Sequence, residues 1–171
     1  MSDRLKFAKH PSLAIYHPNG KGTGAAARFA LIPARVGDPN SGFIYLRLAR
    51  QTGDASVPHY DNVHDLDAEL DFDSLGKMLE VFRGCAEYID DGKGIYQRGE
   101  LGAWKQVVKL EHKIEPAPGY WLEIARSYNE KPDAPERIGI FLRPHEAMAL
   151  SLAIEDSLAA VCFGISEWRM A

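Results

Sequence analysis

The chain has 171 residues, with 20 Lys and Arg against 24 Asp and Glu. Its length suits one ordinary globular domain, and a composition of 46% hydrophobic and 26% charged residues is not that of a disordered chain. Two cysteines are too few for a disulfide framework or a four-cysteine zinc site, and the sequence shows neither a run of about 18 apolar residues nor a signal-peptide core, so we expect a cytoplasmic protein. The formal net charge of −4, taken alone, argues against a nucleic-acid binder, which usually carries a basic surface.

The first predicted elements are two β-strands, at residues 25–32 and 43–50. Both alternate apolar and other side chains with a period of two, as a strand with one buried face does. Arg28 lies on the face of the first strand opposite its main apolar side chains, and Tyr45 and Arg47 take the corresponding face of the second. Pro, Asn and Gly residues gather between these runs, which predicts turns there.

A helix is predicted next, over residues 72–89. Asp71 and Asp73 suit a helix N-terminus, and Gly92 lies just beyond the expected end. The apolar side chains recur every three or four residues and form one stripe: Leu75, Met78, Leu79, Phe82, Cys85, Ala86 and Ile89. We therefore expect Cys85, like Cys162 further on, to be a buried and unreactive thiol.

Three further strands are predicted at residues 104–115, 120–128 and 137–142. In the first of them four side chains are expected to face the helices: Val108, Leu110, His112 and Ile114. Lys109 and Lys113 then face away. The last element is a helix over residues 144–163, which begins at Pro144 and stops at Gly164. Its apolar side chains cover more than one face, so we expect deeper burial than for the first helix.

The charges are unevenly spread along the chain. Residues 1–50 hold eight Lys and Arg against two acids, a net of +6, whereas residues 51–100 hold four against twelve, a net of −8. Seven of these twelve acids lie from Asp54 to Asp73, a stretch that we interpret as an acidic connector. Such an asymmetry indicates either an anionic ligand for the basic segment or an internal charge partner for it.

The order of elements indicates an internal repeat. Residues 46–50 correspond to 122–126 at an offset of 76, and residues 29–33 correspond to 112–116 at an offset of 83. We predict an α+β fold with four strands and a helix in each half, arranged as antiparallel sheets with two helices. A single domain is expected over residues 12–165, made of repeats at about 12–91 and 94–165, with an N-terminal extension at 1–11 and a C-terminal tail at 166–171.

Three segments resemble a known family: residues 21–31, which begin with Lys-Gly, residues 107–116, and residues 142–164. Together they are similar to the Whirly proteins, whose single-stranded nucleic-acid-binding fold is shared by mitochondrial guide-RNA-binding proteins and positive-cofactor-type coactivators. Thr23 and the additional Gly24 depart from the family's Lys-Gly-Lys element. The resemblance implies a sheet that presents basic and aromatic side chains to unstacked bases, and a homotetramer assembled through the helices.

A binding site for single-stranded nucleic acid needs cations for the phosphates and aromatic rings for the bases. The outward strand faces and the turn before the first strand offer such a set: Lys21, Arg28, Tyr45, Arg47, Lys109, Lys113 and Trp121. The alternative is that the cations only keep the sheet soluble, and that Tyr45 and Trp121 pack between sheets or against a subunit.

Other kinds of site find little support. Gly20 to Gly24 lacks the spacing of a phosphate-binding loop and precedes a strand, so a turn is expected there. Residues 59–67 group two histidines with three aspartates but follow no metal-binding spacing, which favours a solvated loop. No arrangement of nucleophile, base and acid is recognisable, and we predict neither catalysis nor a cofactor nor a metal.

The sequence thus predicts a protein that binds single-stranded DNA or RNA without catalysis and acts in transcription, replication or repair. It is expected to form a homo-oligomer, a dimer or tetramer through the helices, and to avoid membranes. The alternative is a protein-interaction or scaffold module of the same fold that does not bind nucleic acid.

Overall fold

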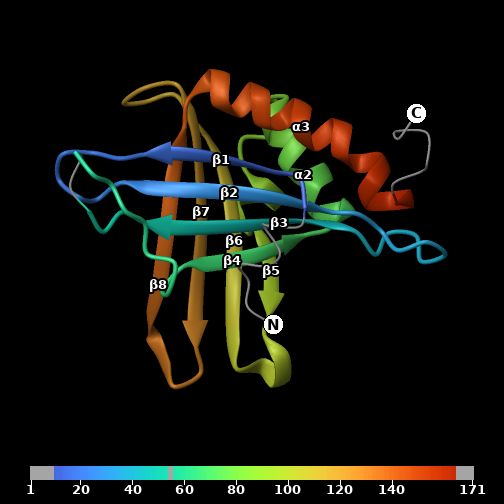
Figure 1. The fold of residues 1–171 in the computed structure, drawn as a ribbon, viewed down its shortest axis with the longest axis horizontal. Helices are drawn as coiled ribbons and strands as arrows, with labels where there is room; N and C mark the ends of the chain where they lie inside the picture. The colour runs from blue at the N-terminus through green and yellow to red at the C-terminus, as the bar shows by residue number, and fades with distance from the viewer. Residues whose placement is uncertain (1–9, 54–55, 165–171) are drawn as a thin grey trace.

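A computed structural model describes residues 10–53 and 56–164, which form two four-stranded antiparallel sheets, each followed by a helix (Figure 1). The elements are β1 (Ser12–His17), β2 (Ala25–Ile32), β3 (Phe43–Arg50), β4 (Leu66–Leu70), α2 (Phe72–Phe82), β5 (Ile95–Arg98), β6 (Trp104–Lys113), β7 (Gly119–Tyr128), β8 (Lys131–Leu142) and α3 (Pro144–Phe163). Single helical turns lie at Ile89–Gly92 and Glu100–Gly102. The first sheet has the order β1-β2-β3-β4 and the second β5-β6-β7-β8. The predicted fold class, four strands and a helix twice over, is therefore confirmed.

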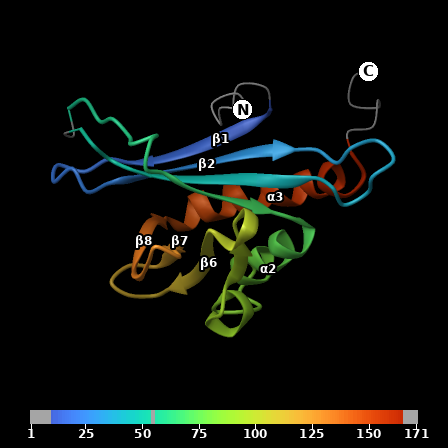
Figure 2. The same cartoon turned by 90° about the horizontal axis from the view of Figure 1, so that it is seen from below.

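The two sheets cross each other, as Figure 1 shows, with the first sheet in front of the second. The turned view in Figure 2 places the first sheet in one layer, with α3 beneath it and the second sheet and α2 beyond. The strands turn one face each toward this interior, where Leu46 and Leu48 of β3 and Leu122 and Ile124 of β7 are fully buried. These four residues occupy equivalent positions in the two third strands, at the offset that the sequence repeat predicts.

The first helix is shorter than predicted. It ends at Phe82, because Arg83 is its C-cap residue and Gly84 takes a left-handed φ of +71° that breaks the helix. Cys85 lies beyond this end and is exposed, so the expectation of a buried thiol there is wrong. Ile89 still enters the core, with 2% of its surface exposed, but it does so from a loop.

Four strands were expected in each half, but the positions of three of them were not predicted from the sequence: β1, β4 and β5. Strand β4 lies within the expected acidic connector, so that interpretation is wrong for residues 66–70. Its Leu66, Ala68 and Leu70 are buried on one face, which leaves the acids on the other. Strand β6 ends at Lys113, and Ile114 is 74% exposed where we expected an inward side chain.

A polar cluster of Asp67, Gln106 and Arg126 joins the two sheets; Gln106 and Arg126 are buried and Asp67 is partly exposed. The Nη2 group of Arg126 donates to the backbone oxygen of Asp67 at 2.9 Å and to its Oδ1 at 3.0 Å. Its Nε donates to Oε1 of Gln106 at 2.8 Å, and Nε2 of Gln106 donates to the same backbone oxygen at 2.8 Å. Because Gln106 and Arg126 find partners in one another and in Asp67, they can be buried at the sheet interface, and the cluster fixes how β4 lies against β6 and β7.

The limits predicted for the domain extend past the described residues. Strand β1 begins at Ser12, where the first repeat was expected to start. Of the predicted extension at 1–11 only His10 and Pro11 are described, and the predicted tail at 166–171 lies outside the described residues. Within the part of the chain that the structure describes, neither helix combines the length and the apolar character needed to cross a membrane.

Candidate nucleic-acid interface

The seven predicted site residues fall on two separate surfaces. Arg28, Tyr45 and Arg47 lie on the outward face of the first sheet, and Lys109, Lys113 and Trp121 lie on the outward face of the second. Because the sheets pack through their inner faces, these two outward faces lie on opposite sides of the domain (Figure 2). Lys21 lies apart from both, in the turn between β1 and β2, where its backbone N–H donates to Oδ1 of Asn19 at 3.0 Å.

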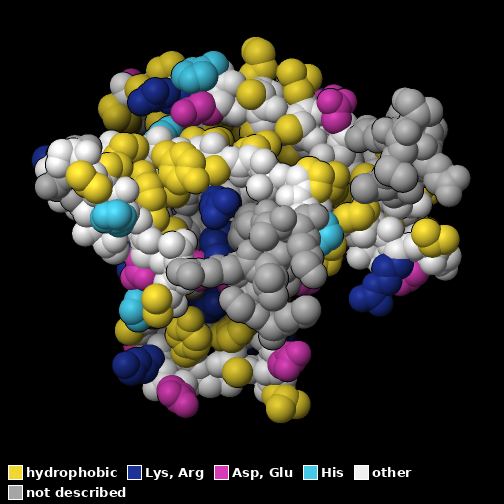
Figure 3. Space-filling model, in the orientation of Figure 1, with side chains coloured by type: hydrophobic (Ala, Val, Ile, Leu, Met, Phe, Trp, Pro, Cys, Tyr) yellow, Lys and Arg dark blue, Asp and Glu magenta, His cyan; other side chains and the backbone are white. Residues whose placement is uncertain are grey.

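Two arginines meet on the face of the first sheet. Arg28 of β2 and Arg47 of β3 are direct cross-strand neighbours, and like charges in that position are destabilising unless an anion offsets them. Asp65 offsets the charge of Arg47: its Oδ2 lies 2.9 Å from Nε of Arg47, whose side chain is only 6% exposed. An internal charge partner for the basic segment, one of the two expected explanations, is therefore present. Figure 3 shows dark blue Lys and Arg atoms running down the middle of this face, across β2 and β3.

Tyr45 lies beside these arginines but is not available as a stacking surface. Its hydroxyl donates to Oδ2 of Asp67 at 2.6 Å, and the residue is 1% exposed. Asp67 thus accepts both from Tyr45 on the outward face and from Arg126 of the second sheet.

A cavity of about 230 Å³ lies on the same face, under the loop that follows β3. The loop folds back over the sheet, where the N–H of Thr52 donates to the oxygen of His59 at 2.8 Å. The rings of Tyr16 and Tyr60 lie 5.4 Å apart in the wall of the cavity, and Arg28 and Arg47 also line it. Burial, and to a lesser extent Tyr16, raises the pKa of the Tyr60 hydroxyl above its usual 10.0.

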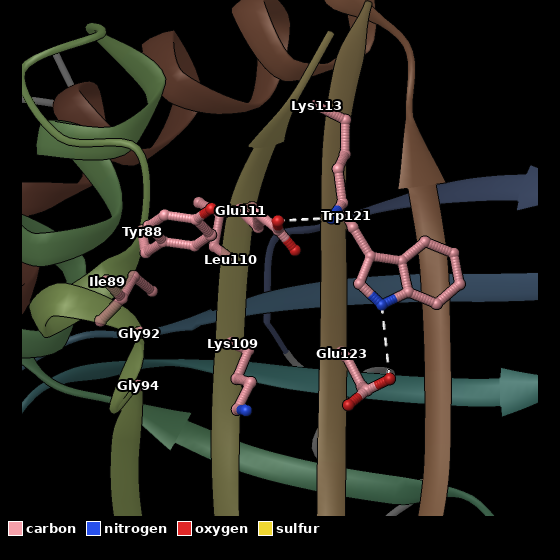
Figure 4. A pocket seen from close by; sticks show the side chains of 10 residues that line it. All are labelled: Tyr88, Ile89, Gly92, Gly94, Lys109, Leu110, Glu111, Lys113, Trp121 and Glu123. Carbon is pink, nitrogen blue, oxygen red and sulfur yellow. Dashed lines mark hydrogen bonds and ion pairs between the residues drawn. The ribbon is translucent and has the colours of Figure 1, made fainter. Parts of the chain in front are cut away.

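A groove of about 450 Å³, larger than this cavity, lies on the outward face of the second sheet (Figure 4). We call it the Trp121 groove. It is lined by Tyr88, Ile89, Gly92, Gly94, Lys109, Leu110, Glu111, Lys113, Trp121 and Glu123. Strands β6 and β7 form its floor, and the loop from α2 to β5 forms the wall opposite Trp121. This groove brings together the three predicted residues of the second half, in the volume range of small-ligand sites.

The indole of Trp121 is held in a defined position over strand β8. A Cβ atom added to Gly139 of β8 would lie 2.2 Å from Cζ2 of Trp121, so only glycine lets the ring lie over that strand. The indole Nε1 donates to Oε2 of Glu123 at 3.3 Å, and Oε1 of Glu123 accepts from Nη1 of Arg137 at 3.1 Å. Figure 4 shows the ring beyond β7 with one broad face toward the viewer. A positioned and partly exposed ring of this kind can stack a base.

Lysines and glutamates alternate along the groove. Lys109 faces Glu123 across the strands, Glu111 faces Trp121, and Lys113 forms an ion pair with Glu111. Within the described part of the chain, no carboxylate forms an ion pair with the Lys109 ammonium group. Lys109 is therefore the groove's most available cation for a phosphate.

Sequence reasoning missed Tyr88, Glu111 and Glu123 as residues of this groove. Tyr88 was placed on the predicted helix, whereas it is 38% exposed on the loop and forms an isolated bridge with Glu111. The two glutamates share the alternation that exposes the lysines, and that signal could have identified them.

The histidine-containing segment is a loop as far as Asp65 and enters strand β4 at Leu66, and Asp65 and Asp67 form ion pairs with Arg47 and Arg126. Nδ1 of His64 lies 2.8 Å from Oδ2 of Asp61, whose pKa is lowered to about 2 by the Val63 N–H first and then by His64. Among the described residues no group of three or more His, Cys, Asp or Glu side chains is arranged to hold a metal ion.

No protein-family model and no curated protein matches this sequence. The fold does have known counterparts: WHY1 from Arabidopsis thaliana superposes with a TM-score of 0.72 at 18% identity, covering 94% of this chain and 88% of WHY1. The chain has a Whirly-like fold. WHY3 from the same plant gives 0.68 at 16% identity, over 89% of this chain and 88% of that one.

Two further structures share this Whirly-like fold. MRP1/MRP2 from Trypanosoma brucei gives a TM-score of 0.61 at 14% identity, over 91% of this chain and 89% of that one. A guide-RNA-binding protein complex bound to a guide RNA gives 0.57 at 15% identity, over 91% and 94%. The resemblance read from the sequence is thus confirmed at the level of the fold.

Proposed function

We propose that this Whirly-like protein binds single-stranded DNA or RNA without catalysis, with the Trp121 groove as the principal contact. The observation that carries the proposal is the groove itself, which is lined by the positioned indole of Trp121 together with Lys109 and Lys113. One protein complex of this fold is bound to a guide RNA, which supports the proposal. A role in transcription, replication or repair, in the cytoplasm, belongs to the same proposal.

The expected binding is driven by stacking and by phosphate contacts. A base stacked on an aromatic side chain contributes about 1–3 kcal/mol. Each neutralised phosphate adds about −0.7 to the slope of log K against log salt for a single strand. With two lysines in the groove we expect a slope of about −1.4 from this site alone, shallower than that of a strongly basic protein.

Arg28, Tyr45 and Arg47 on the other face, with Lys21 in the turn between β1 and β2, are proposed as a second contact. Their share of the affinity is expected to be smaller, because Arg47 is already paired with Asp65 and the Tyr45 ring is buried. An oligonucleotide that contacts both faces must pass around an edge of the domain. The second contact should therefore increase the affinity of long oligonucleotides more than that of short ones.

Fluorescence anisotropy with a labelled 12-nucleotide strand tests the proposal. We expect micromolar or tighter binding at low salt and a loss of about tenfold in the Trp121→Ala and Lys109→Glu variants. Tyr96→Ala is the matched aromatic control, since this residue of β5 is 50% exposed and does not line the groove. The absence of binding to any single strand at low salt would overturn the proposal.

That negative result would instead favour a protein-interaction module of the same fold. One observation points in this direction: many cations of the two faces already have acidic partners, namely Arg47, Lys113 and Arg137. Paired charges of this kind lower the attraction for phosphates without affecting protein docking.

Self-association through the helices is also part of the proposal. Met148, Leu152 and Phe163 of α3 are 67%, 57% and 80% exposed, and large apolar side chains gathered on one helix are typical of an interface. Light scattering should therefore give the mass of a dimer or tetramer. A monomeric mass at micromolar concentration would contradict it.

A further inference from the structure

The Trp121 groove contains two carboxylates as well as its lysines. Tyr88, Glu111 and Trp121 form a row across the sheet, because Tyr88 bridges to Glu111 and Glu111 is the ladder partner of Trp121. In Figure 4 the carboxylate of Glu111 lies between the two aromatic side chains. Neighbouring strands are about 4.8 Å apart, so the backbones at the two aromatic positions are about 10 Å apart with Glu111 midway.

A carboxylate in a nucleic-acid groove repels phosphates, so its useful neighbour is the edge of a base. Glu123 is already occupied, with one oxygen accepting from Trp121 and the other from Arg137. Glu111 accepts through Oε1 from Lys113, a cation that can turn to a phosphate when a strand binds. Its carboxylate is therefore the acceptor that a base stacked on Trp121 would meet.

The four bases present different edges to such an acceptor. An ionised carboxylate accepts hydrogen bonds and cannot donate them. Guanine offers two adjacent donors on its Watson–Crick edge, the ring N1–H and the exocyclic amino group, which match the two oxygens of a carboxylate. Adenine and cytosine offer an amino group beside an acceptor. Thymine and uracil offer one ring N–H between two carbonyl oxygens, which a carboxylate repels.

We propose that the Trp121 groove prefers guanine over thymine and uracil, and that Glu111 is the residue that reads the base. This inference rests on the proposed function, since it describes what the same groove selects. A good bidentate contact discriminates by about tenfold or more between the right and wrong base. Adenine and cytosine should fall between the two extremes.

The test compares three 12-nucleotide strands in lithium buffer, which discourages guanine quadruplexes: all thymidine, alternating thymidine and deoxyguanosine, and alternating thymidine and deoxyinosine. Inosine lacks only the exocyclic amino group of guanine. We expect the full-length protein to bind the guanine strand about tenfold more tightly than the thymidine strand, with the inosine strand between them.

Glu111→Gln provides the decisive variant. Its amide keeps the size of the side chain but can donate to a thymine oxygen, so thymidine binding should rise and the guanine preference should fall toward one. Trp121→Ala should weaken the binding of all three strands and reduce the guanine preference as well, because the ring that holds the base beside Glu111 is gone. Equal binding of the three strands by the unaltered protein would overturn the guanine preference alone, whereas no binding of any strand would overturn the proposed function. A preference that survives in Glu111→Gln would remove Glu111 from the role.

Discussion

Gly139→Ala tests whether the position of the Trp121 ring matters for binding, and it replaces neither a charged nor an aromatic residue. The added Cβ would lie 2.2 Å from Cζ2 and 2.7 Å from Cε2 of the indole. Carbon atoms in contact are about 3.5–4.0 Å apart, so the ring has to retreat by about 1.5 Å. The indole faces solvent on its far side, so the ring can move away and the strand can keep its place.

The size of the effect follows from this displacement. The hydrogen bond from Nε1 to Glu123 is already 3.3 Å long, and a further movement of the ring breaks it. A displaced ring loses part of the stacking energy of about 1–3 kcal/mol per base, so we expect the dissociation constant to rise about 5- to 10-fold. The free energy of unfolding should change by less than about 1 kcal/mol, because the clash is relieved at the surface.

The assay is oligonucleotide anisotropy in a double-mutant cycle with Trp121→Ala. In the Trp121→Ala background the Gly139→Ala change should have no further effect on affinity, because the ring it displaces is gone. Gly76→Ala is the matched control, since a Cβ there meets nothing within 4 Å. The reasoning is refuted if Gly139→Ala weakens binding equally with and without Trp121, or if it shifts tryptophan emission while affinity stays unchanged.

Three further predictions concern stability. Arg126→Met should lower the free energy of unfolding by about 3 kcal/mol in urea titrations, because it leaves Asp67 and its other partners without their buried cation. Leu101→Gly should raise the melting temperature slightly, since Leu101 adopts a left-handed φ of 52° and is fully exposed, so the substitution relieves strain and loses no packing. Burial raises the pKa of Glu146, but hydrogen bonds from His17 and the Arg143 N–H lower it more, so the net pKa lies below the usual 4.5. The stability that Glu146 contributes is therefore present above pH 4.5 and lost as the pH falls through the folded-state pKa, and Glu146→Gln should flatten this part of the acid unfolding curve measured by circular dichroism.

The strands with strong alternation were predictable from the sequence, as β2 and β3 show. Their predicted limits, 25–32 and 43–50, are those of the structure, because a buried face and an outward face impose a period of two on the side chains. Helix α3 was predicted with equal accuracy from its proline start and glycine stop. Strand β4 was missed although Leu66, Ala68 and Leu70 alternate, because its intervening acids made the segment read as a connector.

The limits of the first helix show what local pattern cannot supply. Ala86 and Ile89 continue the apolar spacing beyond Phe82, and only the left-handed Gly84 ends the helix before them. Ile89 is buried by tertiary packing, and an apolar side chain can reach the core from a helix or from a loop, so the apolar spacing does not distinguish between them. The same error concealed Tyr88, since a helical position there gave no reason to place its ring beside Glu111.

The candidate site was predictable by residue type but not by grouping. Alternation along β6 identified Lys109 and Lys113 as outward, and their approach to Trp121 follows from the register of β6 with β7. That register depends on long-range pairing that one sequence does not display. The separation of the two faces was equally hidden, because a list of outward residues does not say which sheet each face belongs to.

Duplication explains how one fold comes to carry two unlike faces. Tyr45 and Trp121 occupy equivalent positions, 76 residues apart, each on the outward face of the third strand of its sheet. In the first half the hydroxyl of Tyr45 is bonded to Asp67 and the ring is buried, while Asp65 holds Arg47. In the second half the position corresponding to Arg47 is Glu123, which bonds the indole nitrogen of Trp121 and keeps the ring on the surface. Equivalent positions therefore hold Arg47 beside a buried tyrosine on the first face and Glu123 beside a partly exposed indole on the second, and of these two rings it is that of Trp121 that is open to a base.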